Sequence, residues 1–193
     1  EMMRRTGEIW VDLDIFALRP FAFENTFVFA WEDGRHDIIN NALLGLPQGS
    51  KTLAKLLTMQ PDTIGIPPKS TFLNRPWLFV STLGRGVGIE RWGMGATGPL
   101  ALTQYLQDTG EYVHALPAEA IYPLHWRDAE RFVAPGGYAL SDAADGAYGL
   151  HFYASELRRI MAEKYAAAVP DGSFLAEAMA QVGAPKLRDV TVD

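Results

Sequence analysis

The stretch Glu8-Ile9-Trp10-Val11-Asp12-Leu13-Asp14 decides how the rest of the chain is interpreted. It opens with a short apolar run, which predicts a buried strand over residues 8–14. Asp12 and Asp14 stand two residues apart, so in an extended chain their carboxylates point to the same side. Because two carboxylates cannot be buried in an apolar core without a large desolvation cost, we expect them at the carboxyl end of this strand.

A carboxylate pair in that position suits a divalent cation. In open α/β sheets, ligands bind outside the carboxyl ends of the strands. Hard oxygen ligands there favour Mg²⁺ or Mn²⁺, and the cation would in turn hold a diphosphate. The D-x-D pattern is also common in solvated turns and at helix N-caps, so taken alone it leaves both interpretations open.

The composition bounds the class of protein. The chain has 193 residues, of which 48% are hydrophobic and 21% charged, as in ordinary globular domains. Its formal net charge is −6, without a dense Lys/Arg run, so we expect neither nucleic-acid binding nor attachment to anionic membranes by charge alone. It has no cysteine, which excludes disulfides and thiolate metal sites. No apolar run approaches the roughly 20 residues of a transmembrane helix.

Helical and extended patterns alternate along the chain, which predicts one α/β domain over residues 1–193. Helices are expected up to residue 6, at 36–44, from Ser50 to residue 60, from Thr97 or Gly98 to residue 108, and at 155–168 and 173–182, the last two being the C-terminal helices at 155–182. Besides the D-x-D strand, strands are expected at 27–31, 77–81, 112–116 and 149–153.

Four further residues are candidates for binding. His151 stands among apolar neighbours, where a histidine is more often part of the core than a ligand, but its neutral imidazole could complete the acid pair. Asn40 and Asn41 are adjacent amides in an apolar stretch, and they could hold a sugar hydroxyl or only cap a local turn. Gly98 precedes a helix that opens with proline, so backbone N–H groups there could face a ligand.

Taken in order, five segments resemble the motifs of one family, the DXD-containing glycosyltransferases. That family includes the yeast initiating α-1,6-mannosyltransferase, the lactosylceramide α-1,4-galactosyltransferase and bacterial capsular polysaccharide transferases. The resemblance covers about residues 1–160. Its segments are Gly7–Asp14 with Leu18-Arg19-Pro20, Asn40-Asn41-Ala42, Thr97-Gly98-Pro99 with Leu102-Thr103, Tyr122-Pro123-Leu124, and His151 with Ser155.

The resemblance implies a GT-A-like (Rossmann-like) fold, a divalent cation, a nucleotide-sugar donor and retention at the anomeric carbon. It assigns no nucleophile or base. It implies metal binding by Asp12, Asp14 and His151, or Ser155 near it, and donor binding by Asp12, Asn40, Asn41 and Gly98. The chain departs from the family at Glu8 and Trp10, where the family has glycine and tyrosine. The family's first βαβ segment, which holds the nucleotide base, is expected to precede residue 1.

The function expected from this resemblance is metal-dependent transfer of a hexose in polysaccharide or glycolipid biosynthesis. The donor would be a UDP-sugar, with GDP-mannose second, and the acceptor a saccharide or a glycolipid. The expected location is the bacterial cytoplasm or the surface of the inner membrane, or the Golgi lumen of a eukaryote. One alternative is a non-catalytic carbohydrate-binding or scaffold remnant of the same fold. Another is a Mg²⁺-dependent phosphoesterase or nucleotidyltransferase, for which Asp33, Asp37 and Asp142 offer no clear second-metal pattern.

Overall fold

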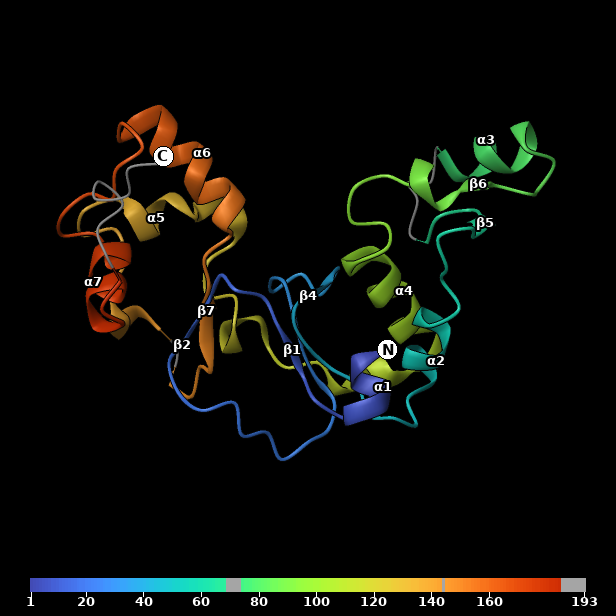
Figure 1. Ribbon diagram of the computed structural model, residues 1–193, viewed down its shortest axis with the longest axis horizontal. Coiled ribbons are helices and arrows are strands. Elements are labelled where there is room, and N and C mark those ends of the chain that lie inside the picture. The colour runs from blue at the N-terminus through green and yellow to red at the C-terminus, as the bar shows by residue number, and fades with distance from the viewer. Residues whose placement is uncertain (69–73, 144, 185–193) are drawn as a thin grey trace. The chain divides into compact units, whose positions relative to one another are not determined.

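The computed structural model describes residues 1–68, 74–143 and 145–184 (Figure 1). Helices and short strands alternate in it, so the protein is mixed α/β. The chain divides into two compact units, which are Glu1–Val11 with Phe23–Pro117, and Asp12–Ala22 with Ala118–Asp193. All strand pairs among the described residues are antiparallel, and a bridge between Ala30 and Leu116 is parallel, so the expected Rossmann-like parallel sheet is not found there.

The first unit is built around a three-stranded antiparallel sheet of order β1-β4-β3. The strands are β1 (Trp10–Val11), β3 (Val28–Trp31) and β4 (Ile39–Gly45). The expectation of a strand at 27–31 is confirmed, whereas the helix expected at 36–44 is wrong. That segment is the central strand, because β4 pairs with β1 on one edge and with β3 on the other.

Local capping signals place the helices of the first unit. Helix α1 (Met2–Thr6) ends at Gly7, whose φ of 73° is left-handed. Helix α2 (Lys51–Leu56) begins after Ser50, whose hydroxyl accepts a hydrogen bond from the amide of Leu53. Helix α4 (Pro99–Thr109) begins after Gly98, with proline at its first position. The end of α1 and the starts of α2 and α4 agree with those expected from the sequence, although α2 ends four residues before residue 60.

Two expected strands of the first unit are wrong. Residues 77–81 belong to helix α3 (Asn74–Ser81), which carries Pro76 in its first turn, where proline is tolerated. Residues 112–116 form mainly the 3₁₀-helix η2 (Glu111–His114), and only Leu116 pairs in an extended manner. Near α3, β5 (Ile64–Gly65) pairs with β6 (Val87–Gly88), which continues into η1 (Ile89–Arg91).

The second unit pairs two short antiparallel strands and packs three helices. Strand β2 (Ile15–Ala17) pairs with β7 (Gly149–His151), so the strand expected at 149–153 is confirmed but ends at residue 151. Helix α5 (Glu130–Val133) packs against α6 (Ala154–Lys164) and α7 (Phe174–Gln181). The remaining elements are the 3₁₀-helices η3 (Ala118–Ala120), η4 (Trp126–Asp128) and η5 (Leu140–Asp142).

The apolar core of the second unit lies between these helices and β7. It contains the aromatic side chains of Phe132, Tyr138 and Phe174, which meet edge to face or tilted. Leu150 of β7 is fully buried in the same cluster. Successive side chains of a strand point to opposite faces, so Leu150 enters this core and His151, the next residue of β7, points to the other face.

Candidate metal centre

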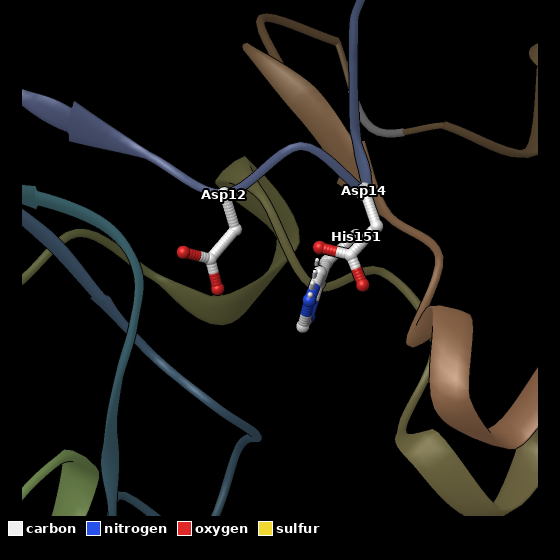
Figure 2. A group of neighbouring side chains, drawn as sticks. All are labelled: Asp12, Asp14 and His151. Carbon is white, nitrogen blue, oxygen red and sulfur yellow. Dashed lines mark ion pairs between the residues drawn. The ribbon is translucent and has the colours of Figure 1, made fainter.

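Asp12 and Asp14 lie in a tight turn that follows β1 in the chain and precedes β2. The amide of Ile15 donates a hydrogen bond to the carbonyl oxygen of Asp12 at 3.2 Å and closes this turn. The expected buried strand over residues 8–14 is therefore wrong: β1 has two residues, and Trp10 is 50% exposed. A turn achieves what the strand was expected to do, because both carboxylates point to the same side of the backbone (Figure 2).

His151 reaches this turn through the pairing of β2 with β7. Ile15 stands opposite His151, and the amide of Phe152 donates to the carbonyl oxygen of Asp14 at 2.9 Å. On its other edge, the amide of His151 donates to the carbonyl oxygen of Ile121 at 3.1 Å. Backbone hydrogen bonds on both edges thus hold the imidazole beside the two acids.

The three side chains converge. Nε2 of His151 lies 3.2 Å from Oδ1 of Asp14, and one ligand atom from each of Asp12, Asp14 and His151 can be chosen so that all lie within 4.8 Å of one another (Figure 2). Ligands bound at about 2.1 Å on adjacent corners of an octahedron are about 3 Å apart. The distance between His151 and Asp14 therefore already fits two ligands of one cation, and Asp12 lies within reach of the third position.

The electrostatics favour an ionised Asp14. Its hydrogen bond with His151 lowers the pKa of the carboxyl group from 3.8 to about 2, against the opposing effect of burial. The amide of Ala154, the first residue of α6, contributes by donating to Oδ2 at 2.9 Å. Asp14 is therefore a carboxylate at every pH near neutrality, and this is the form that binds a metal.

The orientation of His151 restricts how it can act as a ligand. Its side chain is only 9% exposed; Nε2 faces Asp14, and Nδ1 is buried without a hydrogen-bond partner among the described residues. An imidazole nitrogen that binds a metal carries no proton, so the single proton of the neutral ring would lie on Nδ1. Cation binding at Nε2 therefore replaces the hydrogen bond to Asp14 with a coordination bond.

Two aromatic residues position His151, and the sequence assigns this role to neither of them. The ring of Tyr153 lies with its centroid 4.2 Å from that of His151, and its hydroxyl donates to the carbonyl oxygen of Leu124 at 3.2 Å. The ring of Tyr122 meets His151 edge to face at 5.6 Å. Tyr153 also has a φ of 52°, a conformation that bulky residues rarely adopt, and thereby turns the chain from β7 into α6. Nothing in the local sequence indicates such a turn.

Ser155, which the resemblance offers as a metal ligand near His151, stays a prediction. It lies inside the first turn of α6, and the helix begins after Tyr153. The contact to Asp14 is made by the backbone amide of Ala154. This hydrogen bond thus connects Asp14 to the start of α6 through the backbone of its first residue.

The residues expected to bind the donor, Asn40, Asn41 and Gly98, belong to the first unit. The side-chain oxygen of Asn40 accepts a hydrogen bond from the amide of Ala42 at 2.9 Å, which agrees with the local capping interpretation. Asn41 lies next to Gly98, where an added Cβ would stand 3.5 Å from the Asn41 Oδ1. Thr103 explains this proximity, because its buried hydroxyl accepts a hydrogen bond from an amide of β4 at 2.9 Å and so attaches α4 to the strand.

No family model, curated protein or solved structure matches the chain. Among the described residues, no helix has both the length and the apolar character needed to cross a bilayer. The features that bear on function are therefore the convergence of Asp12, Asp14 and His151 and the order of the sequence motifs.

Proposed function

We propose that this chain is the metal-binding part of a GT-A-like, retaining glycosyltransferase that moves a hexose from a nucleotide sugar to a saccharide or glycolipid. The observation that carries the proposal is the convergence of Asp12, Asp14 and His151. The resemblance to DXD-containing glycosyltransferases placed these residues in one metal site, although they come from distant parts of the chain. Independent motifs that meet at one point are a stronger argument than any one of the motifs.

The residues of the site suit Mn²⁺ or Mg²⁺. Two carboxylates and one imidazole form a mixed oxygen and nitrogen ligand set, which Mn²⁺ accepts well. When bound, the divalent cation supplies neutralisation of the charge that builds up on a departing diphosphate. Asp14 is held ready for this role, since Ala154 and the paired strands fix its position before any cation arrives.

On this proposal, Asn41 and Gly98 contact the donor sugar, with UDP-sugars preferred over GDP-mannose. Their proximity supports a shared role, because the side-chain amide of Asn41 lies beside Gly98, the residue that precedes α4. Asn40 is assigned a smaller part, since its side-chain oxygen already accepts a hydrogen bond from Ala42.

A structural role without catalysis is the competing function, and one observation favours it. Both oxygens of Asp14 already have protein partners, one in His151 and the other in the amide of Ala154. The same contacts could serve only to attach α6 to the turn in a non-catalytic carbohydrate-binding or scaffold domain. The two functions differ in whether a cation binds and whether a nucleotide sugar is consumed.

Metal binding is tested by titrating Mn²⁺ into the protein and following the loss of the free-ion signal in electron paramagnetic resonance. We expect Asp12→Asn, Asp14→Asn and His151→Gln each to weaken binding by about 100-fold, since even outer-shell partners of a metal are worth about 10- to 100-fold. The matched controls are Asp128→Asn, an exposed acid of the same unit, and His125→Gln, and both should bind as the unaltered protein does. Equal affinity in all five variants would contradict the metal site.

Donor consumption is tested separately. The chain is incubated with Mn²⁺ and a panel of UDP- and GDP-sugars, and released nucleoside diphosphate is measured with and without Asp14→Asn. We expect release from a UDP-sugar that the substitution abolishes. Metal binding without release from any donor in the panel would favour the non-catalytic domain.

A further inference from the structure

A part of the first unit exposes large apolar side chains. We call it the apolar arm and define it as β5, α3, the following turn at residues 82–86, and β6. Its exposed side chains include Trp77 at 69%, Val80 at 73% and Leu83 at 89%, together with Ile64 and Phe79. Trp77 and Val80 are three positions apart on α3, so they share one face of the helix.

Hydrogen bonds and close backbone contacts hold the apolar arm in shape. The amide of Gly86 donates a hydrogen bond to the hydroxyl of Thr82 at 2.8 Å, and the amide of Ile89 donates to the carbonyl oxygen of Thr63 at 2.9 Å. A Cβ at Gly86 would lie 2.0 Å from the carbonyl carbon of Gly65, so the backbone at Gly86 is in close contact with the backbone of β5. The apolar side chains are therefore left available on the surface of a defined backbone.

The charge of this region is opposite to that of the whole chain. Residues 63–107 contain one acidic residue, Glu90, in a chain whose formal net charge is −6. Arg85 lies in the turn of the apolar arm and is exposed; Arg91, in η1 directly after the arm, is exposed too and lies 3.7 Å from the carboxylate of Glu90. The basic residues of this range whose side chains the structure describes are Arg85 and Arg91. The acidity of the whole chain, which argues against binding anionic membranes, is thus absent from the region that carries the exposed apolar groups.

We propose that the apolar arm docks on the surface of an anionic lipid bilayer. Exposed tryptophan and aliphatic side chains next to basic residues are suited to the boundary between headgroups and acyl chains. Helix α3 has eight residues and is about 12 Å long, so it lies in this boundary and does not cross the roughly 30 Å of hydrocarbon. This inference is independent of the metal site and of the proposed transferase activity.

Vesicle flotation tests the inference, without metal or donor so that its outcome is separate from that of the proposed function. We expect the chain to bind vesicles of phosphatidylcholine with 30% phosphatidylglycerol and to bind pure phosphatidylcholine much more weakly. Trp77→Ser and Val80→Ser should each weaken binding, by about tenfold for the tryptophan. Arg85→Gln should weaken it about fivefold and only on the anionic vesicles.

The matched controls are exposed residues outside the apolar arm. Val113→Ser in η2 and Arg158→Gln in α6 should bind as the unaltered chain does, and circular dichroism should show all variants folded. Equal binding by arm and control variants, or binding that does not depend on the anionic lipid, would overturn the inference. So would absence of vesicle binding together with a dimer in light scattering that Trp77→Ser dissociates, because the arm would then be an interface between two copies.

Discussion

Replacement of Asp14 by asparagine should reveal how much the carboxylate contributes to folding in the absence of any metal. The substitution keeps a side-chain oxygen that can accept from Ala154 but removes the charge that faces His151. The experiment is performed in excess chelator, so any effect reports the fold and not the loss of a bound cation.

The magnitude follows from the lowered pKa. A change from 3.8 to about 2 corresponds to about 2 kcal/mol of preferential stabilisation of the ionised carboxyl group in the folded protein. A group whose pKa is depressed by folding stabilises the protein above its unfolded pKa and loses this effect as the pH falls through the folded pKa. The contribution of Asp14 is therefore complete above about pH 5 and disappears as the pH falls from about 4 through about 2.

The assay is urea unfolding followed by circular dichroism over this pH range, for the unaltered chain, Asp14→Asn and the exposed control Asp128→Asn. We expect Asp14→Asn to lower the free energy of unfolding by about 2 kcal/mol at pH 7 and the difference to shrink towards zero near pH 2. The control should differ by less than about 0.5 kcal/mol throughout. A difference that is the same at pH 3 and pH 7, or absent at pH 7, would refute the reasoning from the Asp14 and His151 contact.

Three further substitutions test other parts of the structure. Thr103→Val should lower the free energy of unfolding by about 1–3 kcal/mol in urea titrations, because it leaves the buried amide of Ile39 without its acceptor. Glu111→Gln should cost about 1–2 kcal/mol, since this carboxylate accepts from the first turn of α2. Although burial raises the pKa of Glu111, those hydrogen bonds lower it on balance, so its contribution should be present at neutral pH and lost in acid. Gly86→Ala should speed amide exchange across β5 and β6, because its φ is +76° and the added Cβ would meet the β5 backbone, whereas Gly34→Ala, with nothing within 4 Å, should leave exchange unchanged.

Elements with local end signals could be predicted from the sequence. Ser50 and Ser173 each accept a hydrogen bond from an amide in the first turn of the following helix, and Pro99 opens α4 as expected. These signals depend only on neighbouring residues, so the rest of the fold does not alter them. The same holds for Gly7, which ends α1 in the left-handed conformation.

Two short apolar runs were assigned wrongly, because their structure depends on distant partners. Residues 39–45 have apolar positions that suit a helix, but β1 and β3 provide hydrogen-bonding partners on both edges and make them a strand. Residues 77–81 suit a strand by composition but form part of α3, whose apolar side chains are exposed. The sequence shows the apolar character in both cases and does not show what covers it.

The candidate site was predicted residue by residue, and its assembly was not. Asp12, Asp14 and His151 were each identified from motifs, and the structure brings them together. The means of assembly differs from the expected sheet edge, since it is a tight turn beside an antiparallel pair of strands. The contact of Asp14 with the amide of Ala154 was missed because the two residues are 140 positions apart.

Ile15 pairs with His151 across β2 and β7, so the candidate site depends on the register of these two strands. Successive side chains of a strand face opposite sides, so a slip of one residue would place Leu150 beside Asp14 and turn the imidazole of His151 into the apolar cluster. Insertion of a single residue between Asp14 and Ile15, with the pairing of β2 and β7 kept, would thus be expected to bring Phe152 in place of His151 beside Asp14 while leaving every residue of the motif in the sequence. A count of motif residues in a related chain is therefore a weaker criterion for a working site than the number of residues that separate Asp14 from β2.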